Sequence, residues 1–248
     1  YEFDRKLRSI LFSAVEEIEV YLRAKFAYFH AHKYGPLGYM DPETFSGKHE
    51  PDKFLETFER EIKNNSRVLF VQHHIEQYDG QFPVWVAVEL FTMGMISRFY
   101  ADLKTPDQKK LAKTLYSTSP RNMVSWLRCI TDLRNICAHY GRLYYRVFSA
   151  CPAGFEISEA AKRRLWGVFL AVRMLYSGRD KWNSEILPAI SALFEEYHSE
   201  INLYHIAFPE DWGEQLKNSE EMRPGSQFPA AFFHALFGRL FSFHNVIE

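Results

Sequence analysis

An excess of one charge is absent from this 248-residue chain, which carries 30 lysines and arginines against 31 aspartates and glutamates. The formal net charge of -1 therefore gives no global field of the kind that draws nucleic acid or an anionic membrane. Any basic surface used for binding has to be local.

Cysteine is scarce, and long apolar runs are lacking. The three cysteines, Cys129, Cys137 and Cys151, are an odd number with no CxxC pair, which favours reduced thiols and a cytoplasmic setting. The longest apolar run, residues 82–96, is shorter than a membrane span and is interrupted by Glu89. With no signal-like segment at its start, the chain is expected to be soluble and to have no membrane partner.

Phosphate loops, serine-nucleophile motifs and metal-ligand spacings are also missing. No glycine-rich loop or GxSxG motif occurs. The paired histidines, His30 with His32 and His73 with His74, lack the same-face spacing of a helical metal site. We therefore expect no metal and no cofactor.

Hydrophobic residues are abundant at 47%, and aromatic residues reach 17%, so a sizeable core can be buried. Apolar side chains recur at three- and four-residue steps over residues 3–29, which predicts a long first helix that Gly35-Pro36 ends. The same period predicts a charged helix over residues 52–77 and a largely apolar helix over residues 85–103. No alternating run calls for a sheet, so the sequence predicts an all-α bundle of roughly six to eight helices.

Three hydroxyl residues mark further helix starts. Thr105 and Ser119 each precede a proline, a pairing typical of an N-cap followed by the first helical residue. Ser158 is expected to cap a helix that ends near residue 177, and another helix is expected over residues 183–197. The helix that begins after Ser119 ends in the most polar motif of the chain.

That motif, at residues 133–146, reads LRNICAHYGRLYYR. Residues 121–146 hold five arginines against a single acidic residue, Asp132, and so supply the local basic patch. Asn135 and His139 are four residues apart and share a helix face, which the side chain of Arg134 can also reach. Arginine suits phosphate binding and histidine carries a proton near neutral pH, so together they suit phosphodiester cleavage.

At these residues the chain resembles the HEPN ribonucleases, whose R-x4-H signature matches residues 134–139. The stretch RNICAHYGRLYYR is similar to abortive-infection proteins of the AbiD/AbiF type, a bacterial phage-resistance branch. Three further blocks resemble the same family: YEFDRKLRSILFSAVEEIEVYLR, FPVWVAVELFTMG and FPEDW. The resemblance covers most of residues 1–213 and departs at Tyr145, where relatives often carry asparagine.

The resemblance implies an HEPN-type helical domain over residues 1–213, with further residues ahead of Tyr1. Residues 214–248 form a C-terminal extension rich in phenylalanine, either a docked helix or a partner-binding arm. The implied activity is metal-independent cleavage of single-stranded RNA that leaves 2′,3′-cyclic phosphate, in bacterial phage defence or as a toxin in the cytoplasm. His139 would handle the proton, Arg134 the phosphorane charge, and Asn135 would orient one of them.

Binding and supporting roles extend the site. Arg142, Tyr144 and Arg146 are candidate RNA-binding residues, because arginines interleaved with aromatics can hold splayed bases. Glu19, Arg23 and Tyr140 are candidate supporting residues.

Each of these roles has a plainer alternative. His139 could be a core or helix-end histidine with Gly141 as the C-cap, Arg134 could simply pair with Glu19, and the tyrosines could be core or interface aromatics.

A single R-x4-H offers one histidine for two proton transfers, so a homodimer with a composite cleft is expected. Possible further partners are an antitoxin or a regulatory RNA. Two other functions remain open on sequence alone: a non-catalytic HEPN module that binds RNA or protein, and a purely structural interaction domain.

Overall fold

The structure is a computed structural model that describes residues 1–217, so most of the predicted extension at 214–248 lies outside the described residues. Within residues 1–217 every regular element is helical, and β pairing is confined to one isolated bridge between Phe45 and Leu103. The predicted all-α class is confirmed.

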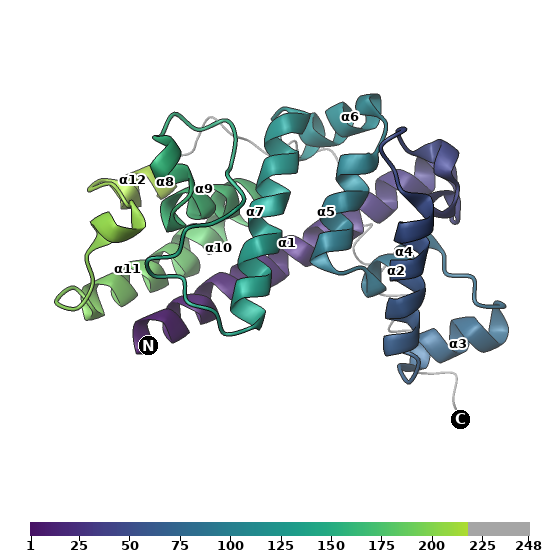
Figure 1. The fold of residues 1–248 in the computed structure, drawn as a ribbon, viewed down its shortest axis with the longest axis horizontal. Coiled ribbons are helices and arrows are strands. Elements are labelled where there is room, and N and C mark those ends of the chain that lie inside the picture. The colour runs from purple at the N-terminus through teal and green to yellow at the C-terminus, as the bar shows by residue number, and fades with distance from the viewer. Residues whose placement is uncertain (218–248) are drawn as a thin grey trace.

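A single long helix, α1 (Glu2–Tyr34), runs through the whole molecule (Figure 1). The predicted end at Gly35-Pro36 is confirmed: the helix runs through Tyr34, and Gly35 follows it with a φ of +81°. The helix that carries the motif, α7 (Pro120–Ala138), crosses α1 near its middle (Figure 1).

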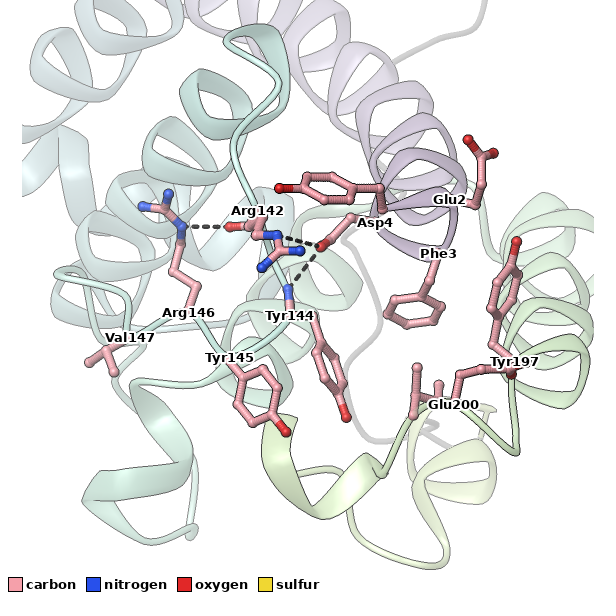
Figure 2. Close-up of a pocket in the computed structure, with 12 residues that line it drawn as sticks. Glu2, Phe3, Asp4, Arg142, Tyr144, Tyr145, Arg146, Val147, Tyr197 and Glu200 are labelled. Atoms are coloured by element: carbon pink, nitrogen blue, oxygen red, sulfur yellow. Dashed lines mark hydrogen bonds and ion pairs between the residues drawn. The ribbon is translucent and has the colours of Figure 1, made fainter.

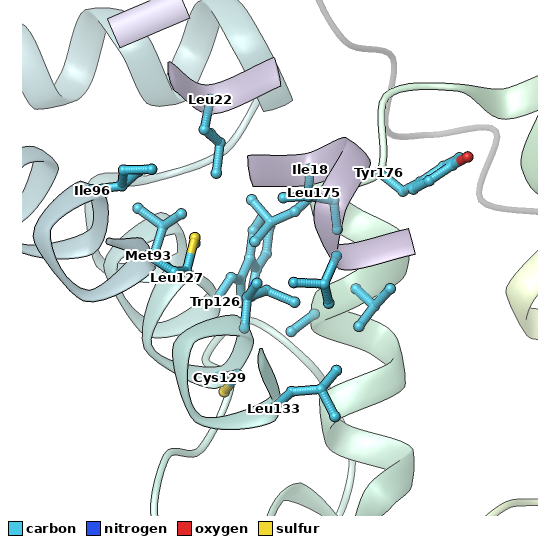
Figure 3. Close-up of a cluster of buried hydrophobic side chains, with 14 of the residues drawn as sticks. Ile18, Leu22, Met93, Ile96, Trp126, Leu127, Cys129, Leu133, Leu175 and Tyr176 are labelled. Carbon is cyan, nitrogen blue, oxygen red and sulfur yellow. The ribbon is translucent and has the colours of Figure 1, made fainter. Parts of the chain in front are cut away.

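Where α1 and α7 cross, their apolar faces form the centre of the core (Figure 3). Ile18 and Leu22 of α1 meet Leu127 and Leu133 of α7, and all four side chains are at most 1% exposed. The part of the motif helix that contains Leu127 and Leu133 is therefore fixed against α1.

The predicted charged helix over 52–77 is two helices, α2 (Pro51–Asn64) and α3 (Leu69–Gln77). The break falls where Asn64, Asn65 and Ser66 follow one another, residues whose side chains compete with the helix for backbone hydrogen bonds. Asn65 does so directly, since its side-chain amide donates to the carbonyl of Glu61 at 2.8 Å.

The predicted apolar helix over 85–103 is also divided, into α4 (Val84–Leu90) and α5 (Met93–Asp102). Thr92 causes the division, because its hydroxyl accepts a hydrogen bond from the Met95 N–H at 3.2 Å and caps a new helix. The break leaves the carbonyl of Phe91 available to a side-chain donor at the candidate site.

Two of the three predicted caps are confirmed. Ser119 accepts from the Asn122 N–H at 3.2 Å and starts α7, and Ser158 accepts from the Ala161 N–H at 3.1 Å. Thr105 is instead the first residue of α6 (Thr105–Tyr116), and Lys104 occupies the cap position.

The helix that Ser158 starts is shorter than expected, with α8 (Glu159–Lys162) separated from α9 (Leu165–Leu175). The Phe148 N–H donates to the Arg163 carbonyl at 2.8 Å, so this carbonyl is hydrogen-bonded to the loop after α7 rather than to the next helical turn.

The last predicted helix, 183–197, is built from short pieces: α10 (Arg179–Lys181), a π-helical turn over Trp182–Ile186 and α11 (Leu187–Glu196). Pro188 has no N–H to donate, so the regular hydrogen-bond ladder cannot continue through it. The final described helix, α12 (Trp212–Lys217), continues across residue 213, the predicted end of the domain, and buries Leu216 in the same core.

All three cysteines are free thiols in this fold. Burial raises the pKa of Cys129 to about 12 and that of Cys137 to about 11, so both thiols are unreactive at neutral pH. Among residues 1–217, no helix has the length and apolarity to cross a membrane.

Candidate functional site

The motif lies at the C-terminal end of α7, where the chain turns out of the helix. The Gly141 N–H donates to the Ile136 carbonyl at 2.8 Å and the Tyr140 N–H donates to the Cys137 carbonyl at 3.1 Å, the two hydrogen bonds of a Schellman motif. The left-handed position of this motif belongs to Tyr140, with φ of +56°, and not to Gly141 as the sequence suggested.

Gly141 is needed here for a different reason, which is space. A Cβ atom at Gly141 would lie 2.9 Å from Cγ2 of Ile136 and 3.2 Å from its carbonyl oxygen. The tight turn after His139 therefore depends on a close backbone approach, while Tyr140 adopts a backbone conformation that glycine usually takes.

His139 is the C-cap residue of α7, and its backbone N–H donates to the Asn135 carbonyl at 3.0 Å. The side chains of Asn135 and His139 are both exposed, one helical turn apart. The His139 ring makes no hydrogen bond or ion pair with any residue in the described part of the chain. The reading of His139 as a buried core histidine is therefore wrong, and the alternative reading as a helix-end histidine is confirmed.

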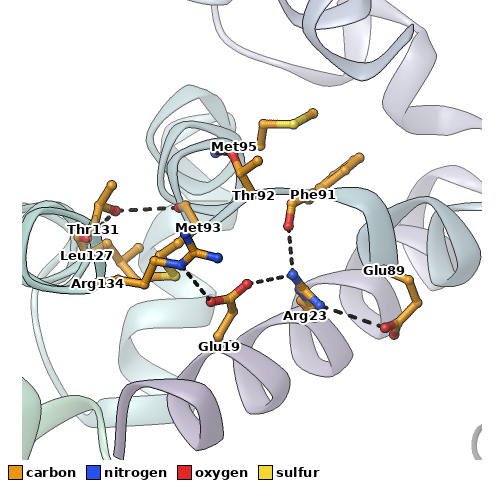
Figure 4. A network of polar contacts seen from close by, with 10 residues as sticks. All are labelled: Glu19, Arg23, Glu89, Phe91, Thr92, Met93, Met95, Leu127, Thr131 and Arg134. Atoms are coloured by element: carbon orange, nitrogen blue, oxygen red, sulfur yellow. Dashed lines mark hydrogen bonds and ion pairs between the residues drawn. The ribbon is translucent and has the colours of Figure 1, made fainter. Parts of the chain in front are cut away.

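Arg134 points the other way, toward α1 (Figure 4). Its Nε lies 3.9 Å from Oε2 of Glu19, a long ion pair between a side chain that is 36% exposed and one that is 11% exposed. The alternative that Arg134 pairs with Glu19 is thus confirmed. The same Nε is buried without a hydrogen bond among residues 1–217, so the guanidinium is only partly satisfied.

Glu19 in turn is held by Arg23, whose NH2 donates to Oε1 of Glu19 at 2.5 Å. The same guanidinium donates to the Phe91 carbonyl at 2.9 Å and lies 3.8 Å from Glu89. The predicted supporting residues are therefore connected to the motif helix: Glu19 contacts Arg134, and Arg23 holds Glu19 (Figure 4). The break between α4 and α5 supplies the carbonyl that fixes Arg23.

The loop after the motif is fixed to the start of α1 by a buried carboxylate. Asp4 is 5% exposed, and its Oδ1 accepts from the N–H groups of Leu143 and Tyr144 at 2.8 and 3.0 Å. Arg8, one turn later on α1, donates to the Gly141 carbonyl at 3.1 Å. Neither residue was predicted from the sequence, because the only feature they share there is a four-residue spacing on one face of α1.

Beside this loop lies an open pocket of about 800 Å³ (Figure 2). All three predicted RNA-binding residues, Arg142, Tyr144 and Arg146, line it. Arg134, Asn135, His139 and Tyr140 do not, so the structure places the predicted catalytic and RNA-binding groups in two adjoining parts of one segment. Tyr140, predicted as a supporting residue, is 84% exposed.

The pocket wall is held in an unusual backbone conformation. Tyr145 has φ of +64°, and its carbonyl accepts from NH1 of Arg164 at 2.8 Å. Its hydroxyl and that of Tyr144 are both hydrogen-bonded to Nδ1 of His205, at 2.8 and 3.1 Å. Arg164 and His205 are further site residues that the sequence alone does not reveal, because they come from distant segments.

Residues 1–217 contain no group of three or more histidine, cysteine, aspartate or glutamate side chains with a geometry suitable for a metal ion.

The fold and the site together define an all-α protein that presents Arg, Asn and His at a helix end beside an arginine-rich loop. A model of the Abi-like protein family matches residues 1–145, from the first turn of α1 through the loop after His139. The chain belongs to this Abi-like family, so the abortive-infection resemblance seen in the sequence is confirmed. No curated protein and no solved structure matches it significantly.

Proposed function

We propose that this Abi-like protein is a metal-independent endoribonuclease of the HEPN type, which cleaves single-stranded RNA in bacterial phage defence. The observation that carries the proposal is the exposed pair of Asn135 and His139, which leads directly into a loop that presents Arg142 and Arg146 at an open pocket. RNA bound along the loop would place a phosphate beside the exposed imidazole of His139. Family membership supports the defence role.

In this proposal His139 moves the proton between the 2′-hydroxyl, itself and the leaving oxygen, as a solvent-facing imidazole can. Arg134 stabilises the negative charge that builds on phosphorus, and Asn135 orients the phosphate or the imidazole. Glu19 keeps Arg134 in place before RNA arrives. The Arg134 side chain is 36% exposed, and its contact with Glu19 is long and made through the buried Nε, so the terminal NH1 and NH2 groups are left for a phosphate.

The experiment is incubation of the purified protein with mixed single-stranded RNA in EDTA, followed by analysis of the product ends. Cleavage that leaves 2′,3′-cyclic phosphate supports the nuclease. Intact RNA at high enzyme concentration, with the protein shown to be folded by circular dichroism, contradicts it.

A homodimer with a composite cleft is part of the same proposal, because one protomer supplies one His139 for two proton transfers. Mixed dimers of wild type with His139→Ala are expected to lose most of the activity. Mixed dimers that keep half, or a monomer with full activity, would contradict the composite cleft. We also propose that a partner, either an antitoxin or a regulatory RNA, holds the enzyme inactive.

A non-catalytic module is the second candidate, and one observation favours it: Arg134 already has a carboxylate partner in Glu19. The same residues would then recognise RNA or protein without cleaving it. Binding of RNA that weakens with salt, with no cleavage under any condition, distinguishes this candidate from the nuclease.

A further inference from the structure

The pocket beside the motif loop has opposite charges on its two sides (Figure 2). Arg142 and Arg146 lie on the side next to the motif loop, and both are exposed. Glu2 and Glu200 lie on the opposite side. Glu2 is already engaged by Arg5 at 2.7 Å, whereas the Glu200 carboxylate has no hydrogen bond or ion pair with residues 1–217.

Aromatic rings line the pocket between its two charged sides. Tyr144 lies 5.7 Å from Phe3 and 4.5 Å from Tyr145, and Phe3 lies 5.7 Å from Tyr197, measured between ring centroids. Phe3 is 6% exposed and forms part of the apolar floor.

The tyrosine wall of this pocket is rigid. His205 binds both of its hydroxyls, and Tyr144 also accepts from the Asn202 N–H at 2.8 Å. Arg164 holds the left-handed backbone of Tyr145 through its carbonyl. A backbone strained in this way persists only where surrounding contacts determine it, and such positions concentrate at binding sites.

A nucleotide has the same three-part order: an anionic phosphate, a flat ring system and a polar base edge. The pocket volume of about 800 Å³ falls in the range of small-molecule sites and exceeds what one nucleotide needs. Arginines suit the phosphate and tyrosine faces suit the base. The charges, the rings and the volume therefore all match one ligand class.

We propose that this pocket binds one nucleotide of the RNA, with its phosphate on Arg142 and Arg146 and its base against Tyr144 and Tyr145, and that Glu200 selects a base with an amino group. An ionised carboxylate only accepts hydrogen bonds. Cytosine presents an amino donor at C4, where uracil presents a carbonyl oxygen that a carboxylate repels. The pocket therefore discriminates against uracil.

The inference rests on the proposed function only in taking RNA as the source of the nucleotide. Free nucleotide and RNA share the chemistry that the pocket recognises, so the two sources are tested separately. Because the first test measures binding and not cleavage, its result is independent of the nuclease activity.

The first test compares the dissociation constants of CMP and UMP by isothermal titration calorimetry on the His139→Ala protein. Because a hydrogen bond to a charged acceptor separates the two bases, CMP is expected to bind about tenfold more tightly than UMP. Glu200→Gln should remove this preference, since an amide can serve either base. Equal affinities, or no binding of either nucleotide, overturn the pocket assignment.

A matched control is Glu195→Gln, which removes an exposed carboxylate from α11, the helix just before the turn that holds Glu200, at a residue that does not line the pocket. It should keep the tenfold preference. Loss of the preference in this variant as well would assign the effect to net charge and overturn the role of Glu200. Unchanged melting temperatures show that both variants are folded.

The second test compares a uridine nonamer with one that carries a single central cytidine, again on His139→Ala. Tighter binding of the cytidine nonamer supports an RNA subsite, and equal binding despite a CMP preference shows a site for free nucleotide instead and overturns the RNA assignment. If the wild type cleaves RNA but CMP and UMP bind with equal affinity, the pocket is overturned and the nuclease stands. A CMP preference without cleavage overturns the nuclease and leaves the pocket.

Discussion

The two ends of α1 use the same kinds of residue for opposite purposes. Near its C-terminal end, Phe26, His30, Phe45 and Phe99 form a closed aromatic cluster, with ring centroids 5.0 to 6.3 Å apart and every member at most 4% exposed. Near its N-terminal end, Tyr144 and Tyr145 surround an open pocket.

Charged groups differ between the ends in the same way. At the C-terminal end Asp107 is 2% exposed, accepts from the hydroxyl of Tyr34 at 2.6 Å and is bound by Lys33. At the N-terminal end the buried Asp4 accepts two backbone N–H groups with Oδ1, and its Oδ2 lies 3.9 Å from Nε of Arg142, whose side chain is 60% exposed.

The comparison teaches that aromatic and charged content does not by itself locate a site. What separates the ends is whether the side chains are buried inside the protein or left exposed at a pocket.

His139→Ala at the open end should have the largest effect. Removing the proposed proton carrier is expected to lower the rate of RNA cleavage by about 10²–10⁴-fold, while the melting temperature stays unchanged because the side chain is exposed. Single-turnover cleavage and thermal unfolding measure the two quantities. His32→Ala, an exposed histidine in the last turn of α1, is the matched control and should cleave normally.

Phe99→Ala at the closed end should show the reverse pattern. This ring is 2% exposed within the aromatic cluster, so its loss is expected to lower the free energy of unfolding by about 3–5 kcal/mol. RNA binding measured well below the melting temperature should be retained. Leu69→Ala, at a side chain 78% exposed, should change stability by less than about 0.5 kcal/mol. Equal losses in both variants would contradict the closed cluster.

His30 gives the closed end a dependence on pH. Desolvation in the cluster lowers its pKa from 6.5 to about 4, so between these values the unfolded chain binds more protons than the folded one. Stability is therefore complete above about pH 6.5 and falls as the pH falls, by about 2 kcal/mol between pH 7.5 and 5.

Urea unfolding at the two pH values should show this loss in the wild type and a smaller loss in His30→Gln. The other titrating groups are common to both proteins and cancel in the comparison. Identical pH dependence in the two proteins would contradict the lowered pKa of His30.

Tyr140→Gly should have the smallest effect and returns to the open end. Glycine adopts the left-handed conformation of Tyr140 without strain, and the exposed ring packs against little, so stability should rise by about 1 kcal/mol. Tyr140→Ala removes the ring without relieving the backbone and should give no such gain. If cleavage falls in both variants, the ring itself serves the proposed activity.

Much of the fold was predictable from local pattern. The long first helix, the start of α7 at Ser119 and the all-α class follow from apolar period and cap residues, which act over a few positions. The breaks at Asn65 and Thr92 were missed, because a hydrophobic period continues unchanged across a point where a side chain takes over a backbone hydrogen bond.

The candidate site divides in the same way. Arg134, Asn135 and His139 were predictable because one helix end contains them all, and their spacing fixes their faces. Asp4, Arg8, Arg164 and His205 were not, since each reaches the motif loop from a segment far away in the sequence.

The sequence by itself determined the helical class, the family and the residues of the motif, because periodicity, caps and a contiguous signature are encoded in neighbouring positions. Only the tertiary structure decided that His139 faces solvent while Arg134 faces Glu19, and that Tyr145 lines a pocket whose other side carries Glu200. The physical reason is that burial and charge pairing depend on which distant segments pack together: α1 fixes Arg134 and the start of the motif loop, and Arg164 and His205 fix Tyr145.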